Sequence, residues 1–131
     1  VGCGSGILGI ASVLLGAEEA FGADIDETAV RIANENAELN DVVGKFTAQC
    51  GDLTEKAKGK YNFILENIVA DVIINLTDNI KNFMEDDATF VMSGIIDTRE
   101  KDVLAALNKN GFDVIERKPE NGWVCLVAKS R

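Results

Sequence analysis

The chain begins with a glycine-rich run, Val1-Gly2-Cys3-Gly4-Ser5-Gly6, that leads directly into an apolar segment with helical character over residues 7–16. Glycines at alternate positions let the backbone turn tightly and approach a ligand closely. The helix that follows points its first N–H groups and the positive end of its dipole toward that ligand. Because Gly4, Gly6 and Gly9 also satisfy G-x-G-x-x-G, the loop alone fits a dinucleotide, another adenosine ligand or a simple tight turn.

Strand and helix signals alternate along the rest of the chain. We expect strands over residues 19–24, 45–50, 61–66 and 88–93 and a helix over residues 27–39. A second helix is expected to bury one apolar stripe, formed by Val69, Val72, Ile73, Leu76, Ile80 and Phe83. A third helix, capped by Asp97, is expected to end before Gly111. Two final runs, residues 112–117 and 123–128, flank Pro-Glu-Asn-Gly and predict a hairpin.

This alternation predicts an α/β fold of the doubly wound, Rossmann-like kind. Its sheet would be mostly parallel and covered on both faces, with the C-terminal hairpin adding an antiparallel edge. A glycine-rich turn of this type normally follows a strand, and none precedes Val1. We therefore expect residues 1–131 to be one domain cut from a longer protein.

Composition and charge narrow the functional classes. The chain has 131 residues, 47% of them hydrophobic and 27% charged, which fits one globular domain. Its net charge of -9 repels phosphate backbones, so we expect no direct binding of nucleic acid. The same charge either attracts a basic partner or only keeps the protein soluble. No apolar run approaches the ~20 residues of a membrane span, so a cytoplasmic protein is expected.

The cysteine and histidine content restricts the chemistry further. Cys3, Cys50 and Cys125 share no metal-ligand spacing, so we expect no metal site and interpret them as reduced, mostly buried thiols. The chain has no His. That excludes Ser-His and Cys-His nucleophilic catalysis and the common zinc sites that contain His.

Two aspartates follow the second predicted strand. Asp24 lies twenty residues after Gly4, where a carboxylate can accept hydrogen bonds from both ribose hydroxyls of a bound adenosine. Asp26 stands just before Glu27-Thr28-Ala29, so it is interpreted first as a helix N-cap and second as a ligand contact.

Two further polar positions follow later strands. Asp52 and Leu53 follow a strand end and could meet an adenine amino group and ring, or form a plain turn. Asn67 ends a buried strand, where its amide could orient an incoming amine or cap the next helix. Glu66 could act similarly, although strand alternation allows only one of the two side chains to face a ligand.

The order of these elements resembles that of class I S-adenosylmethionine-dependent methyltransferases, whose first three motifs look like residues 1–6, 22–26 and 51–53. The closer resemblance is to the PrmA family, which methylates ribosomal protein L-eleven. It spans nearly the whole chain and rests on GCGSGILG at 2–9, GADID at 22–26, NENAELN at 34–40, NIVA at 67–70, SGI at 93–95 and GWVCLV at 122–127. Amino-methylating relatives that act on adenine or glutamine carry Asn-Pro-Pro in place of Asn-Ile-x-Ala.

The resemblance implies a C-terminal catalytic domain that transfers a methyl group from S-adenosylmethionine to Lys side chains and the α-amine of a basic ribosomal protein. The family pattern implies cofactor-binding roles for Gly2, Gly4, Gly6, Asp24, Ile25, Asp52, Leu53 and Asn67. Gly2, Gly4 and Gly6 would hold the methionine end. Asp24 would hold the ribose, and Asp52 and Leu53 the adenine. Asn67 would also be the catalytic residue that orients the substrate amine.

Three departures accompany the resemblance. The family's first strand, with its acidic residue, and its N-terminal substrate-recognition domain are both missing from residues 1–131. The usual Ala before Asn67 is Glu66 here. The alternatives are a methyltransferase of the same fold that acts on another protein, RNA or small-molecule amine, and an NAD-dependent oxidoreductase fragment.

Overall fold

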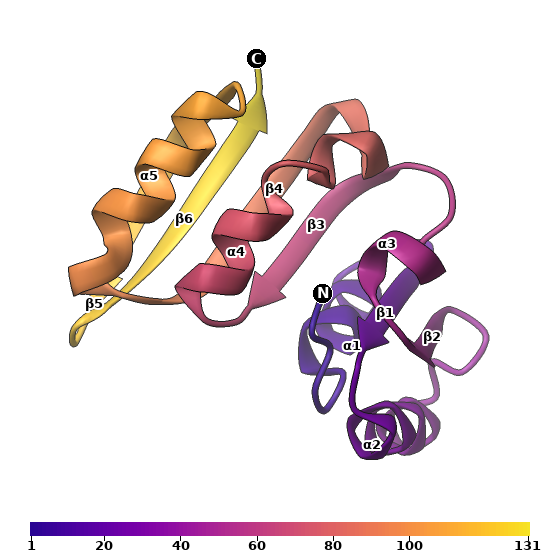
Figure 1. The fold of residues 1–131 in the computed structure, drawn as a ribbon. Coiled ribbons are helices and arrows are strands. Elements are labelled where there is room, and N and C mark those ends of the chain that lie inside the picture. The colour runs from indigo at the N-terminus through magenta and orange to yellow at the C-terminus, as the bar shows by residue number, and fades with distance from the viewer. The chain divides into compact units, whose positions relative to one another are not determined.

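The computed structural model describes residues 1–52 and 55–131 in full, and residues 53 and 54 by their backbone alone. The chain divides into two compact units, Val1–Ala57 and Lys58–Arg131, which are described separately below. Figure 1 shows the elements of each unit.

The first unit is a small α/β layer. Its elements are α1 (Ile7–Leu14), β1 (Ala20–Asp24), α2 (Glu27–Leu39), β2 (Phe46–Cys50) and the short α3 (Leu53–Lys56). β1 and β2 pair in parallel, from Ala20 opposite Phe46 to Asp24 opposite Cys50. Both strands therefore end at the same edge of the sheet. The loops that follow Asp24 and Cys50 meet there.

Close packing of α1 on the sheet explains one of the glycines. A Cβ at Gly9 would lie only 2.5 Å from Cε2 of Phe46, a ring that is buried in the core of this unit. The third glycine of G-x-G-x-x-G therefore serves helix–strand packing rather than ligand contact. The buried members of this core are Ile10, Val13, Ala33, Ala37, Val42, Phe46 and Ala48.

The second unit is a mixed four-stranded sheet with helices on it. Its elements are β3 (Tyr61–Asn67), α4 (Ala70–Leu76), the 3₁₀ helix η1 (Ile80–Phe83), β4 (Met84–Ile96), the 3₁₀ helix η2 (Asp97–Arg99), α5 (Glu100–Lys109), β5 (Phe112–Glu120) and β6 (Trp123–Ser130). The strand order is β3-β4-β6-β5. β3 runs parallel to β4, and the pairs β4–β6 and β5–β6 are antiparallel.

Two helices cover the core of this sheet. α4 and α5 contact each other and pack on the strands, as Figure 1 shows. Phe90, Met92 and Leu126 of the sheet and Val103 and Leu107 of α5 are fully buried. Hydrophobic burial between one helix layer and one sheet face therefore stabilises this unit.

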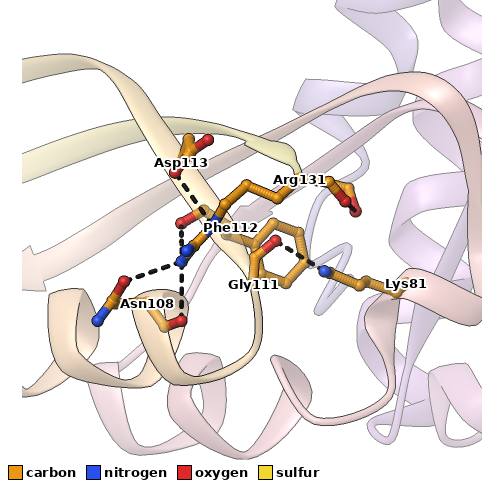
Figure 2. Close-up of polar contacts among 7 residues, drawn as sticks. Lys81, Asn108, Gly111, Phe112, Asp113 and Arg131 are labelled. Carbon is orange, nitrogen blue, oxygen red and sulfur yellow. Dashed lines mark hydrogen bonds and ion pairs between the residues drawn. The ribbon is translucent and has the colours of Figure 1, made fainter.

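Polar contacts close the C-terminal end of α5, and Figure 2 shows them. Nζ of Lys81 donates to the carbonyl oxygen of Gly111 at 2.7 Å and lies 4.8 Å from the ring centroid of Phe112. Arg131 donates to the carbonyl oxygen of Asn108 at 2.9 Å and to its Oδ1 at 2.8 Å. Cations at this position satisfy the last carbonyls of the helix and complement its dipole.

Several sequence predictions are confirmed. The helix over 27–39 has the expected bounds, and Gly111 follows α5 with a φ of 73°. The C-terminal hairpin is present, with a two-residue turn at Asn121 (φ 50°) and Gly122 (φ 83°). Positive φ at both positions is the signature of a type I′ turn. β5 is the edge strand, where Pro119 is tolerated.

The predicted stripe from Val69 to Phe83 is wrong in part. α4 ends at Leu76, and the later apolar residues belong to η1, so the two segments do not share one helical phase. Ile73 and Ile80 are buried, whereas Val69 is 64% and Val72 43% exposed. Helical spacing alone identified the apolar positions but not the break between the two helices.

Asp97 does not cap α5. It lies in η2, three residues before Glu100, and the N-cap position of α5 is Arg99, which makes no side-chain capping bond. The 3₁₀ turn between strand and helix separates Asp97 from the first N–H groups of α5. β4 is also longer than the predicted strand over 88–93, because it begins at Met84 and includes the exposed Glu85 and Asp86.

Cys3, Cys50 and Cys125 are free thiols, in agreement with the prediction, and each is mostly but not fully buried. In the part of the chain that the structure describes, no helix is both long and apolar enough to span a membrane.

Candidate functional site

Asp24 joins two loops at the carboxyl edge of the first unit. Its Oδ2 accepts a hydrogen bond from the N–H of Gly4 at 2.9 Å, and its Oδ1 accepts one from the N–H of Asp26 at 3.0 Å. An ionised carboxylate has about four acceptor positions, so each oxygen can accept one more bond. Asp24 can therefore hold the glycine loop and still receive hydroxyl donors from a ligand.

The glycine loop has a backbone that only glycine adopts easily. Gly2, Gly4 and Gly6 have φ angles of 58°, 51° and 82°. A Cβ at Gly4 would meet no atom within 4 Å, whereas one at Gly6 would lie 3.1 Å from Cβ of Ala33. Gly4 thus borders open space beside Asp24, and Gly6 allows the close approach of α2.

Two asparagines of α2 hold this loop and the sheet, and the sequence reasoning gave them no role. Nδ2 of Asn36 donates to the carbonyl oxygen of Ser5 at 2.8 Å. Asn34 exchanges two hydrogen bonds with the backbone of Ala48 in β2, both 3.1 Å long. A side-chain amide can pair with a strand backbone in this way, as a neighbouring strand would. Asn34 and Ala48 are 14 residues apart, so local sequence patterns did not reveal their contact.

The loop after β1 contains a capping residue and an exposed apolar one. Oδ1 of Asp26 accepts from the N–H of Thr28 at 2.8 Å, which confirms Asp26 as the N-cap of α2. The side chain of Ile25 is 82% exposed. Its apolar surface is therefore open to solvent next to Asp24.

The loop after β2 lies beside Asp24. The N–H of Gly51 donates to the carbonyl oxygen of Asp24 at 2.9 Å, and Sγ of Cys50 lies 3.6 Å from the carbonyl oxygen of Ile25. Asp52 is exposed, and its carbonyl oxygen accepts from the N–H groups of Glu55 and Lys56, both at 3.1 Å. The side chain of Leu53, the other predicted adenine contact, is outside the described residues.

Cys3 lies inside the glycine loop but is not an activated nucleophile. Its N–H donates to the carbonyl oxygen of Ala23 at 3.0 Å, which fixes the loop against β1. Burial and the nearby Asp24 carboxylate raise the pKa of the Cys3 thiol. The protonated form therefore dominates near neutral pH.

Glu66 and Asn67 end β3 in the second unit and have opposite environments. Glu66 is only 1% exposed and alternates with buried Ile64, whereas Asn67 is exposed. Only Asn67 is accessible, as the alternation predicted. The N-cap position of α4 is Val69, and it has no side-chain capping bond, so Asn67 is not the cap of this helix.

Burial gives Glu66 an unusual titration. Neither carboxylate oxygen has a hydrogen-bond partner among the described residues. Burial raises the pKa of Glu66 from 4.5 to about 7. A carboxyl group in this position favours its neutral form, because the charged form loses its hydration.

Solved structures define the class of fold. The chain aligns with a tRNA methyltransferase of B. subtilis, TrmK, at a TM-score of 0.79 and 19% identity over 100% of this chain and 58% of that one. It also aligns with an RNA methyltransferase of Salinibacter ruber at a TM-score of 0.75 and 17% identity, over 96% of this chain and 74% of that one. The predicted Rossmann-like fold of class I methyltransferases is confirmed.

The family follows from closer relatives. The model of the family described as ribosomal protein L11 methyltransferase (PrmA) matches residues 1–131, so the chain belongs to this family. A crystal structure of the ribosomal protein L11 methylase of Lactobacillus delbrueckii subsp. bulgaricus aligns with a TM-score of 0.95 and 29% identity, over 99% of this chain and 67% of that one.

Curated relatives agree with this family. The ribosomal protein L11 methyltransferase of Desulfitobacterium hafniense is 44% identical over 130 residues, which are 98% of this chain and 41% of that protein. That of Ruminiclostridium cellulolyticum is 42% identical over 131 residues, 98% of this chain and 42% of that protein. The chain thus spans about four-tenths of the length of these relatives.

Proposed function

We propose that the complete protein that contains residues 1–131 transfers methyl groups from S-adenosylmethionine to amino groups of ribosomal protein L11. The proposal rests on membership of the family and on one observation, the position of Asp24 between the glycine loop and the loop after β1. In this proposal residues 1–57 bind the cofactor, and Asn67 orients the amine that is methylated.

The first unit fits such a cofactor. Gly4 borders open space next to Asp24, as a loop that admits the methionine end must do. Gly2 and Gly6 extend the same left-handed backbone. Each Asp24 oxygen retains an acceptor position for a ribose hydroxyl. The carboxylate is already fixed by two N–H donors, so less side-chain entropy is lost when a ligand binds.

The adenine end fits the loops after β1 and β2. The exposed Ile25 would pack on one side of the base, and Asp52 would accept a hydrogen bond from the adenine amino group. Leu53 keeps its predicted place beside the ring, and Asn67 its predicted contact with the cofactor. These four assignments are proposals from the sequence pattern.

Catalysis would depend mainly on alignment. When bound, S-adenosylmethionine supplies a methyl group that its sulfonium sulfur makes strongly electrophilic. Oδ1 of Asn67 would accept an N–H bond of the substrate amine and so direct the nitrogen lone pair. The chain has no His, and a reaction limited by alignment requires no imidazole base.

The charge of the chain fits the proposed partner. A net charge of -9 favours association with a basic protein such as a Lys-rich ribosomal substrate and disfavours direct contact with RNA. A ribosomal substrate would also place the enzyme in the cytoplasm.

The test is methyl transfer from isotopically labelled S-adenosylmethionine to purified ribosomal protein L11, with the modified amines located by mass spectrometry. We expect label on Lys side chains and the α-amine with wild-type protein, and a strongly reduced rate with Asn67→Ala. Label on RNA or on another ribosomal protein, with none on L11, would contradict the proposed substrate.

A further inference from the structure

A glycine of β4 lies against the side chain of Asn67. Ser93 pairs with Asn67 across the β3–β4 ladder, and Gly94 follows Ser93 at the point where the pairing of β4 with β6 shifts, between Met92 and Ile95. Gly94 has a φ of 78°. An irregularity of this kind is a β-bulge, which redirects the chain and often stands beside an active site.

The absence of a side chain at Gly94 leaves the space that Asn67 uses. A Cβ there would lie 2.8 Å from Oδ1 of Asn67. It would also lie 2.7 Å from the carbonyl oxygen and 3.0 Å from the backbone nitrogen of Ile68. Contacts this short are repulsive, so the Asn67 side chain or the Ile68 peptide would have to move. Ile68 is itself fixed, because its N–H donates to the carbonyl oxygen of Ser93 at 3.2 Å.

A second contact holds the segment that follows Asn67. Asp71, in the first turn of α4, pairs with Arg99 after β4 at 2.7 Å, and Arg99 also pairs with Asp102 at 2.8 Å. The hydrogen bond from Arg99 lowers the pKa of Asp71, so this carboxylate stays ionised near neutral pH. The turn between β3 and α4 is therefore fixed by Gly94 at its start and by Arg99 at its end.

We infer that Gly94 is a positioning residue: its missing Cβ sets the orientation of the Asn67 carboxamide, and through it the alignment of the substrate amine. This inference rests on the proposed function. The sequence did not assign Gly94 a role, although an isolated glycine inside a strand pattern is a general signal of a bulge or a close backbone approach.

The test compares Gly94→Ala with a matched variant, Gly122→Ala, in the complete protein. Gly122 has a φ of 83°, close to that of Gly94, but the nearest atom to a Cβ there is Oδ2 of Asp97 at 4.0 Å. The two substitutions therefore impose the same kind of backbone strain, and only Gly94→Ala adds the collision with Asn67. Methyl transfer to ribosomal protein L11 is measured as kcat and KM, and affinity for S-adenosylhomocysteine by calorimetry.

We expect Gly94→Ala to lower kcat by roughly 10- to 100-fold, because small misplacements of a reacting group cost this much, with nearly unchanged cofactor affinity. Gly122→Ala should keep the wild-type kcat. If Gly94 acts through Asn67, the double variant Gly94→Ala/Asn67→Ala should be no slower than Asn67→Ala. A double variant whose kcat falls by the product of the two single effects would overturn the inference. So would a wild-type kcat in Gly94→Ala or an equal loss in Gly122→Ala.

A spectroscopic arm separates this inference from the proposed function. In the ¹⁵N-labelled complete protein, the side-chain NH₂ signals of Asn67 should shift in Gly94→Ala and stay in place in Gly122→Ala. Unmoved Asn67 signals in Gly94→Ala would overturn the positioning role whatever the activity. If the Asn67 signals shift in Gly94→Ala but the wild-type protein methylates no substrate, the positioning of Asn67 is supported and the proposed function is contradicted.

Discussion

Among single residues, Asp24 has the central role in the proposed binding of the cofactor. Asp24→Ala removes the acceptor of the Gly4 and Asp26 N–H groups together with the proposed ribose contact. We expect the affinity for S-adenosylhomocysteine to weaken by about 1–3 kcal/mol, the cost of losing a charged hydrogen-bond partner. Calorimetric titration of the complete protein measures it.

The control for Asp24 is Asp26→Ala, because Asp26 caps α2 and makes no proposed ligand contact. Losing this cap should lower the free energy of unfolding by about 1 kcal/mol and leave cofactor affinity nearly unchanged. If both variants weakened binding equally, the loss would come from the loop as a whole and not from the Asp24 carboxylate.

The buried Glu66 should make the free energy of unfolding depend on pH. Its pKa is about 7 when folded and 4.5 when exposed, so the folded state binds the proton more tightly. The free energy of unfolding should therefore fall as pH rises from about 4.5 to 7 and then level off, a loss of about 3 kcal/mol for a shift of this size. The free energy of unfolding can be measured at each pH by urea unfolding monitored through Trp123, the one Trp of the chain. Trp123 lies in the same unit as Glu66, Lys58–Arg131.

The matched variant is Glu66→Gln, which keeps the shape and cannot titrate. We expect its stability to change less between pH 5 and 8 than that of the wild type. Equal pH profiles for the two proteins would mean that Glu66 is solvated or paired in the folded state.

At the scale of elements, Gly9 tests the packing of α1 on β2. Gly9→Ala gains helix propensity, worth about 1 kcal/mol, but places a Cβ 2.5 Å from Phe46. Overpacking of a buried ring costs about 1–3 kcal/mol, so we expect net destabilisation. Urea unfolding followed by circular dichroism measures it against Gly44→Ala, where a Cβ meets no atom within 4 Å. A Gly9→Ala protein as stable as Gly44→Ala would contradict this packing.

Elements with a local stop signal were predictable from the sequence, and those set by tertiary contacts were not. Asp26 fixed the start of α2, and Asn121-Gly122 fixed the hairpin. The break between α4 and η1 has no Gly or Pro to mark it, and the bulge at Gly94 depends on pairing with β6. Likewise, the spacing of Asp24 from Gly4 predicted a ribose contact, which stays a prediction, but not the hydrogen bond between the two residues. The contact of Asn67 with Gly94 joins residues of two paired strands and has no local signal.

At the scale of the whole molecule, residues 1–131 span about four-tenths of the curated relatives they match. The family could be predicted from the sequence, because the stretches that resemble it are spread over nearly the whole chain. The net charge of -9 agrees with a basic partner but does not by itself choose one.

Binding of S-adenosylmethionine through the loops around Asp24 can be tested by calorimetric titration of the complete protein with S-adenosylhomocysteine, with NAD in a matched control. We predict saturable binding of S-adenosylhomocysteine at one site and none of NAD. Binding of NAD alone, or of neither ligand, would contradict a cofactor site for S-adenosylmethionine at Asp24.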